Sequence, residues 1–381
     1  MIYFDNSATT KPYLEVLDSF IKVAGNYFGN PSSLHGVGGQ AEKLLNQART
    51  QTAELLGVKP DEILFTSGGT ESNNLAIKGV ALAGENRGRH IISSKIEHPS
   101  VSTAMEQLEK LGFEVSFVPV DAFGFVNPED IRRELRNDTI LVSVMHVNNE
   151  TGAIQPIKEI GAIVRDYPKV LFHVDYVQGA GKVPLDFHLC GIDLCSLSGH
   201  KFHGLKGTGA LYVREGVRLF PLFSGGSQEK ARRSGTENVA GAVALAKALR
   251  MSLAKREAGV LVMEKLNLQL RSELGSIPGV TIHSSEWNNA PHILNFSIKG
   301  LKTEVFVHAL EEKNIFVSTT SACSSKKNRG SKTLLAMGVP HELAASAVRI
   351  SLSYENTLEE AKIVGNAIKE TVNRLGEVMN R

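Results

Sequence analysis

Cysteine is scarce in this chain of 381 residues, and its three copies are Cys190, Cys195 and Cys323. An odd and sparse set does not predict a disulfide framework, and no second Cys or Cys/His pair completes a zinc site. Apolar neighbours indicate that Cys190 and Cys195 are buried and pack as small hydrophobic residues. Cys323 lies in a polar, basic stretch, 318–332, where nearby cations favour the nucleophilic thiolate. We therefore expect Cys323 to be exposed and reactive, with an idle surface thiol as the alternative.

Long apolar runs and an excess of one charge are also lacking. No apolar run reaches the roughly 20 residues that span a bilayer, and the first residues do not show a basic region followed by an apolar one, as an export signal would. The formal net charge of +2 argues against a dedicated nucleic-acid or polybasic membrane surface. We expect a cytoplasmic protein that acts on small molecules or protein partners, with no direct nucleic-acid or membrane contact.

Short apolar runs alternate with helical patterns through the first two-thirds of the chain. This alternation predicts an α/β fold with a mostly parallel sheet covered on both faces. One helix has a clear start at Asn127-Pro128, an N-cap candidate followed by proline at the first helical position. The expected strands are 62–66, 90–93, 114–120, 140–146, 170–174, 193–197 and 209–213.

A smaller α+β pattern follows the helical stretch 239–249. It has expected strands at 292–298 and 315–318 around a helix at 303–312, and a last helix that begins with a capping-box match at Thr357. The predicted division is a large domain of residues 13–254 and a small domain of residues 1–12 with 255–381. The small domain would carry Cys323.

Lys201 directly follows an expected buried strand and a Ser-Gly-His turn. Its amine should therefore lie at the carboxyl end of the strand, where open α/β sheets bind ligands. Without acidic neighbours in the sequence, such an amine is partly neutral and nucleophilic, and it can hold an aldehyde cofactor as a Schiff base. The alternative is an ordinary solvated loop lysine.

Four further motifs suit pyridoxal phosphate, although each also has a purely structural interpretation. The Gly68-Gly69-Thr70 turn between strand and helix is an anion site for a phosphate, or else a simple helix cap. Asp175 ends a strand and could keep a pyridoxal ring nitrogen protonated, or else cap a turn. His98, between a strand and a helix, could stack on the ring and carry protons. The fourth motif, 232–238, offers hydroxyl and backbone donors to a phosphate, or else is a surface turn.

Together these motifs resemble the aminotransferase class V family of pyridoxal-phosphate enzymes, and within it the cysteine desulfurases of the NifS/IscS type. The resemblance covers nearly the whole chain and implies the pyridoxal-phosphate transferase fold type I, with a large and a smaller domain. It runs through residues 3–10, 29–35, 68–72, 97–98, 145–152, 173–175, 198–201, 233–236 and 321–323.

The resemblance also implies roles for the cofactor-binding residues. Lys201 would be the Schiff-base lysine, Asp175 would pair with the ring nitrogen, and His98 would stack on the ring. Thr236 would reach the phosphate of a neighbouring subunit, which implies a homodimer. The remaining cofactor contacts would be Gly69, Thr70, Ser198, His200, Gln178 and Asn149.

The implied reaction converts L-cysteine to L-alanine and leaves a persulfide on Cys323. Arg349 would bind the substrate carboxylate, a task for which a planar fork suits better than lysine, and Asn149 would contact the substrate. The persulfide sulfur would pass to a protein acceptor, an iron-sulfur scaffold or a tRNA-thiolation enzyme. Selenocysteine lyase and a non-catalytic, cofactor-binding dimeric interaction protein are the alternatives. Tyr176 and Ser353-Tyr354 depart from the residues common in the family.

Overall fold

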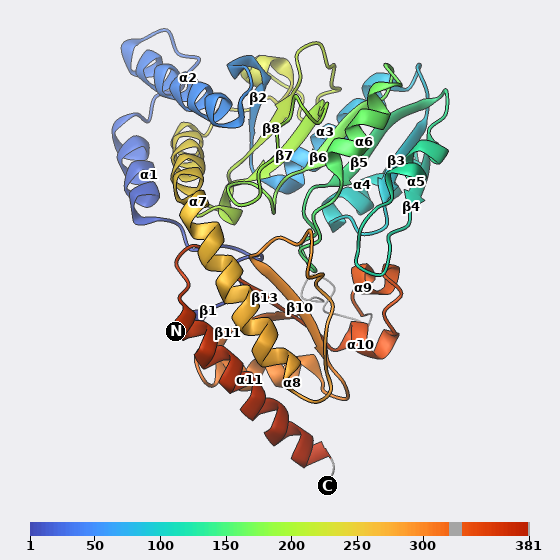
Figure 1. Cartoon of the computed structure of the whole chain (residues 1–381). Helices are drawn as coiled ribbons and strands as arrows, with labels where there is room; N and C mark the ends of the chain where they lie inside the picture. The colour runs from blue at the N-terminus through green and yellow to red at the C-terminus, as the bar shows by residue number, and fades with distance from the viewer. Residues whose placement is uncertain (320–329, 380–381) are drawn as a thin grey trace.

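The computed structural model describes residues 1–319 and 330–379, so Cys323 lies outside the described residues. Figure 1 shows a large sheet with its helices above a smaller sheet, with one long helix, α7 (Val239–Gly275), running from the upper part into the lower. No helix in the described ranges is long and apolar enough to cross a membrane.

The large sheet has seven strands in the order β2-β8-β7-β6-β5-β3-β4. Only β8 runs antiparallel to its neighbours, and the other strand pairs are parallel. The predicted α/β fold with a mostly parallel sheet is therefore confirmed. The strands are β2 (Ile63–Thr66), β3 (His90–Ser94), β4 (Glu114–Val118), β5 (Thr139–Met145), β6 (Leu171–Asp175), β7 (Leu194–Ser198) and β8 (Gly209–Val213).

Helices cover the sheet and join its strands. The expected start at Asn127 is confirmed, because its side chain accepts a hydrogen bond from the Glu129 backbone N–H at 3.1 Å. The helices of this part are α1 (Leu14–Asn26), α2 (Gly36–Leu56), α3 (Gly69–Gly84), α4 (Pro99–Glu109), α5 (Pro128–Glu134) and α6 (Ile157–Arg165). Short 3₁₀ turns are η1 (Pro60–Glu62), η2 (Gly199–Lys201) and η3 (Gln228–Ala231).

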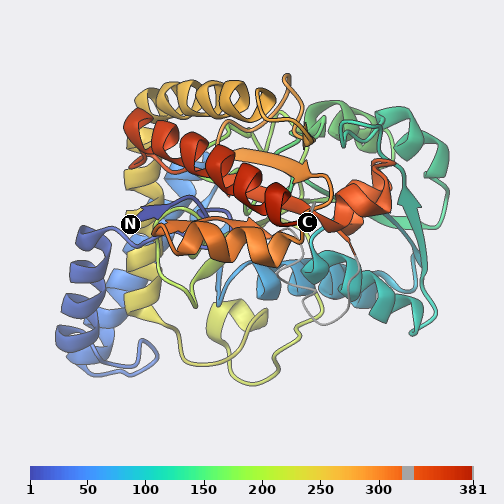
Figure 2. The same cartoon turned by 90° about the horizontal axis from the view of Figure 1, so that it is seen from below.

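The smaller sheet is antiparallel, with the order β12-β13-β10-β9, and a parallel pair joins β1 to β11. Figure 2 shows α8 and α11 side by side across this part of the molecule. The predicted capping box is present, because Thr357 and Glu360 exchange side-chain to backbone hydrogen bonds. The elements are β1 (Ile2–Tyr3), β9 (Val280–Ile282), β10 (Ile293–Ile298), α8 (Thr303–Glu311), β11 (Ile315–Phe316), β12 (Ser318–Thr319), α9 (Lys332–Ala336), α10 (His341–Ala345), β13 (Ala347–Ser351) and α11 (Leu358–Met379).

The described residues form two main hydrophobic clusters along α7. Leu245 and Leu249 of this helix pack with the core that covers one face of the large sheet. Farther along the helix, Leu266 and Leu270 pack with Phe4 in the core of the small sheet. The division at residues 12/13 and 254/255 stays a prediction. Cys190 and Cys195 are 6% and 0% exposed, as expected of packing residues.

Candidate active site

Lys201 ends the 3₁₀ turn η2, which follows β7 directly. The turn is tight, because a Cβ on Gly199 would lie 2.3 Å from Thr208 Oγ1. The Lys201 Nζ donates hydrogen bonds to the backbone oxygens of Ser7, at 2.6 Å, and Ala8, at 2.8 Å. The amine thus lies at the carboxyl end of the sheet, against the N-terminal segment of the chain.

Asp175 ends the neighbouring strand β6 and is 5% exposed. Its Oδ1 accepts from the Val177 N–H at 3.0 Å, and its Oδ2 accepts from Asn73 Nδ2 at 2.8 Å. Asn73, on α3, also donates to Ser100 Oγ at 2.8 Å. Sequence reasoning missed Asn73 as a site residue, although it stands directly after the Gly-Gly-Thr-Glu-Ser turn. These hydrogen bonds fix the orientation of a carboxylate that is almost fully buried.

His98 is the N-cap residue of α4 as well as a candidate ring-stacking group. Its Nδ1 accepts a hydrogen bond from the Ser100 backbone N–H at 3.1 Å, which leaves the ring proton of the neutral imidazole on Nε2. Burial lowers the pKa of His98, the Lys201 charge lowers it further, and the Asp175 charge opposes both. A neutral imidazole therefore faces the site at physiological pH.

The turn between β2 and α3 has the shape of a phosphate cradle. Its N-cap Gly68 has a φ of 151° and provides no side-chain cap, so the first backbone N–H groups of α3 point outward. A Cβ on Gly69 would lie 2.8 Å from Val177 Cγ2 and 3.5 Å from Ser198 Cβ, so only glycine leaves this space open. Thr70 is exposed at the same turn, and Ser198 is 2% exposed beside it. These residues fit a bound phosphate group.

Gln178 and His200 also contact the N-terminal segment. Gln178 Nε2 donates to the Ser7 backbone oxygen at 3.0 Å, while its buried Oε1 lacks a partner among the described residues. His200 Nδ1 lies 3.2 Å from Thr9 Oγ1. Burial and nearby lysines, Lys201 first among them, lower the pKa of His200 to about 4, so this imidazole is neutral. The unpartnered amide oxygen fits a donor group on a bound cofactor.

Arg349 lies on β13 of the small sheet and is 7% exposed. Its Nη1 donates to the Asn149 backbone oxygen at 2.8 Å, and its Nη2 pairs with Asp5 Oδ1 at 3.0 Å. Its Nε is buried without a partner among the described residues. Because a guanidinium has five N–H donors, Arg349 keeps donors for a carboxylate ligand.

Among the predicted residues that the structure describes, Thr236 is not brought to the others. It is exposed, and within the described residues it makes no hydrogen bond to another predicted site residue. Its neighbour Arg233 pairs instead with Glu71 on α3 at 2.7 Å. The loop therefore lies beside the phosphate cradle of its own chain while Thr236 faces outward.

The two departures from the family pattern are packing residues. The Tyr176 hydroxyl donates to the Val183 backbone oxygen at 2.7 Å, and its ring contacts His146 and Phe187. The Tyr354 hydroxyl donates to the Gly181 backbone oxygen. Neither the Tyr176 nor the Tyr354 side chain displaces a predicted site residue.

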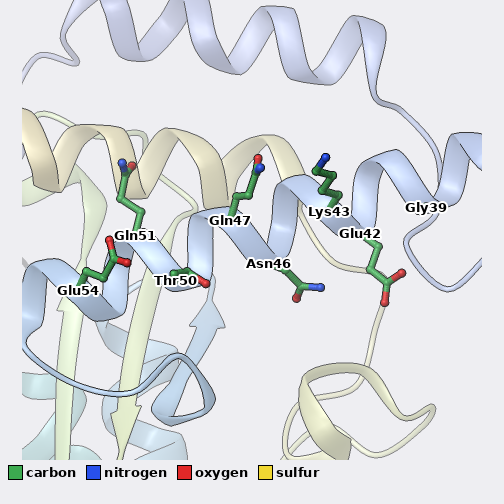
Figure 3. A pocket seen from close by; sticks show the side chains of 8 residues that line it. All are labelled: Gly39, Glu42, Lys43, Asn46, Gln47, Thr50, Gln51 and Glu54. Atoms are coloured by element: carbon green, nitrogen blue, oxygen red, sulfur yellow. The ribbon is translucent and has the colours of Figure 1, made fainter.

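An open hollow beside α2 is separate from this site. Figure 3 shows that its lining side chains all come from α2. None of them is a predicted site residue. They are Gly39, Glu42, Lys43, Asn46, Gln47, Thr50, Gln51 and Glu54.

Comparison with known proteins places the site in a family. Residues 2–364 match the family Aminotransferase class-V. The "NifS/IcsS protein homolog" of Lactobacillus delbrueckii subsp. bulgaricus is 50% identical over 99% of this chain and 100% of its own length. The "Cysteine desulfurase IscS" of Methanosarcina thermophila is 44% identical over 98% of this chain and 92% of its own length. A solved "NIFS-LIKE PROTEIN" superposes with a TM-score of 0.93 at 39% identity, covering 98% of this chain and 99% of that one. The chain belongs to the aminotransferase class-V family.

Proposed function

We propose that this protein is a pyridoxal-phosphate-dependent cysteine desulfurase, which converts L-cysteine to L-alanine and retains the sulfur as a persulfide. The observation that carries the proposal is the convergence of the Lys201 amine, the buried Asp175 carboxylate and the Arg349 guanidinium on one end of the sheet. Relatives named cysteine desulfurases at 40–44% identity over nearly the full chain support it. No observation favours selenocysteine lyase or a non-catalytic interaction protein.

Pyridoxal phosphate, when bound, supplies an aldehyde for the substrate amine and a ring that accepts electron density from Cα. Lys201 would hold the aldehyde, and Asp175 would hold the proton on the ring nitrogen. The backbone N–H groups after Gly68, with Thr70 and Ser198, would bind the phosphate. Gln178 Oε1 would accept a hydrogen bond near the ring hydroxyl.

The chain's own residues would then orient the amino acid and move protons. Arg349 and Asn149 would bind the substrate at its carboxylate end. The Lys201 amine, once displaced from the cofactor, would take the Cα proton, and neutral His98 would assist from the face of the ring. His200 would contact the cofactor without adding charge.

Cys323 would be the sulfur acceptor. Its thiolate would attack the substrate sulfur, so that a sulfur–sulfur bond forms as the carbon–sulfur bond breaks. The substrate Cβ takes a proton, alanine leaves, and Cys323 carries the sulfane sulfur. Cysteine and the enzyme thiol together supply every atom of alanine and the persulfide.

A replacement of Cys323 tests the proposal directly. In Cys323→Ala, we expect cofactor binding and the absorbance change on adding L-cysteine to persist, while alanine release falls by more than 100-fold. Cys190→Ala is the matched control, since Cys190 is a packing residue, and it should retain turnover. Alanine release by Cys323→Ala at the wild-type rate would contradict the assignment. Parallel rates with selenocysteine would separate a desulfurase from a selenocysteine lyase.

Assembly and sulfur delivery are also proposals. A homodimer in which the exposed Thr236 reaches the neighbouring subunit's phosphate would complete the site. The persulfide would pass to a protein acceptor in the cytoplasm, an iron-sulfur scaffold or a tRNA-thiolation enzyme. Mixing Lys201→Ala protein with Thr236→Ala protein tests the shared site, because mixed dimers would regain one complete site and part of the activity. Identifying the first protein labelled by a radioactive Cys323 persulfide would name the acceptor.

A further inference from the structure

The N-terminal segment 5–10 contacts both Arg349, which would bind the substrate carboxylate, and Lys201, which would hold the cofactor. Asp5 pairs with Arg349, while the backbone oxygens of Ser7 and Ala8 accept from the Lys201 amine. The segment is itself fixed to β13. The Asn6 N–H donates to the Ser351 backbone oxygen at 3.2 Å, and the Ser7 N–H donates to Ser351 Oγ at 2.8 Å.

The ion pair between Asp5 and Arg349 is largely shielded from water. The Asp5 Oδ1 to Arg349 Nη2 distance is 3.0 Å, and the two side chains are 20% and 9% exposed. A guanidinium at this depth needs a charged partner, since burying an unpaired charge is unfavourable. Asp5 therefore pairs with the buried Arg349 charge and fixes one edge of the guanidinium, while Nε has no partner among the described residues.

Tyr3 is a titratable neighbour of the ion pair between Asp5 and Arg349. Tyr3 donates from its hydroxyl to the Thr9 backbone oxygen at 2.9 Å. Burial raises the pKa of Tyr3, the Asp5 charge raises it further, and the Arg349 charge opposes them. Tyr3 is thus a neutral neighbour, and Asp5 is the anion that faces Arg349.

The spacing along the segment relates the two contacts to each other. Asp5 and Ser7 are two residues apart, a backbone separation of at most about 7 Å. The same short stretch of backbone therefore contacts both Arg349 and the Lys201 amine. In an α-amino acid, the amine that replaces Lys201 and the carboxylate that binds Arg349 are attached to one carbon atom.

We propose that Asp5 is a specificity-determining positioning residue, which aligns the Arg349 fork so that the site selects α-amino acids by their carboxylate. The inference rests on the proposed function. Asp5 acts through Arg349 and does not itself contact the substrate.

The test compares amines that differ only in the carboxylate. L-Alanine and ethylamine share the same methyl side chain, and β-alanine carries its carboxylate one carbon farther away. Each displaces Lys201 by amine exchange, so cofactor absorbance reports its Kd without any sulfur chemistry. The proteins are wild type, Asp5→Asn, Arg349→Met and the double variant, all cofactor-loaded. Asp18→Asn, at an exposed aspartate of α1, is the matched control.

In Asp5→Asn, we expect the Kd for L-alanine to rise at least tenfold and that for ethylamine to change less than twofold. The ratio of the Kd for β-alanine to the Kd for L-alanine should fall. KM for L-cysteine should rise by a larger factor than kcat falls. In a protein that already carries Arg349→Met, adding Asp5→Asn should leave these Kd values unchanged. Equal weakening of alanine and ethylamine, or unchanged discrimination, would overturn the proposal and leave a purely structural ion pair. If Asp5→Asn folds poorly, Asp5→Glu applies the same comparison. Failure of the proposed desulfurase activity would show separately, as absent sulfur transfer with this amine selectivity intact.

Discussion

At the scale of single residues, the Asp175 carboxylate accepts a hydrogen bond from Asn73, a neighbour 102 positions away along the chain. Asn73 is 1% exposed and bridges Asp175 to Ser100, which in turn contacts His98. One amide thus connects the Asp175 carboxylate to the turn that carries His98.

Replacing Asn73 should affect cofactor affinity more than the stability of the fold. In Asn73→Ala, Asp175 loses a charge-assisted hydrogen bond, worth about 1.5–3 kcal/mol. We expect cofactor affinity to fall at least tenfold, as measured by titrating apoprotein and following absorbance. Asn74→Ala is the control, because among the described residues the Asn74 side chain donates to the backbone oxygens of Thr70 and Ser100 and not to Asp175. Equal losses in both variants would argue against the role of Asn73.

A second residue-scale prediction concerns Glu97. Burial raises the pKa of Glu97 to about 8. Hydrogen bonds from the Ser94 hydroxyl and the Met145 backbone N–H oppose this increase, and the Asp175 charge adds to the increase. Because the folded chain holds this proton and the unfolded chain releases it from about pH 4.5, Glu97 costs stability as pH rises toward 8.

Glu97→Gln should remove that pH-dependent cost. The free energy of unfolding of Glu97→Gln relative to wild type should grow by more than about 2 kcal/mol between pH 5 and pH 8. Urea unfolding at several pH values measures it. Glu106→Gln, at an exposed glutamate of α4, serves as the control. A difference that stays flat across this range would show that Glu97 is ionised when buried.

The positions of the main candidate site residues could be predicted from the sequence, because these residues lie just after strands. Lys201, Asp175 and His98 each follow a predicted strand, and the carboxyl ends of parallel strands meet at one edge. The roles of Asn73 and Asp5 depend on hydrogen bonds that span 102 and 344 positions. Such pairings follow from the packed fold, which local patterns do not specify.

At the scale of elements, α7 is a single helix of 37 residues, whereas the sequence indicated a helical pattern at 239–249 that runs into the charged stretch 255–257. Expected strands agree with the observed ones to within two residues, but β1, β9 and β13 were not expected. The strand β13 pairs with β10, 50 to 58 residues earlier, and that pairing places Arg349. The expected single strand at 315–318 is two short strands, because β11 joins β1 and β12 joins β13.

Gly259 of α7 should be intolerant of a side chain. A Cβ there would lie 2.1 Å from Tyr354 Cδ1, so Gly259→Ala must displace the ring that bonds to Gly181. We expect a loss of about 1–3 kcal/mol in urea unfolding. Gly275→Ala, at the open end of the same helix, should be neutral or gain up to about 1 kcal/mol. Similar effects in both variants would contradict the packing at Gly259.

At the scale of the whole molecule, the first ten residues connect the small core to the cofactor site. Phe4 is 0% exposed and packs with Leu266 and Phe296, and the next residues contact Arg349 and Lys201. Stability of the small core and geometry of the site are therefore linked through one segment.

Phe4→Ala should reveal this link. Removing the buried ring should lower the free energy of unfolding by about 3–5 kcal/mol, and cofactor affinity should fall in parallel because segment 5–10 loses its anchor. Calorimetry and absorbance titration measure the two effects, with exposed Leu14→Ala as the control. Full cofactor affinity in a destabilised Phe4→Ala protein would show that the two are independent.

The acceptors of the Lys201 amine are main-chain oxygens, and this has a consequence for mutational scans. Every residue type supplies a carbonyl, so exchanging the side chain of Ser7 or Ala8 leaves both hydrogen bonds available. A one-residue insertion between Phe4 and Ser7 would instead shift both oxygens away from the amine while keeping every original side chain. The lysine therefore depends on the length of this segment, a requirement that point substitutions do not detect.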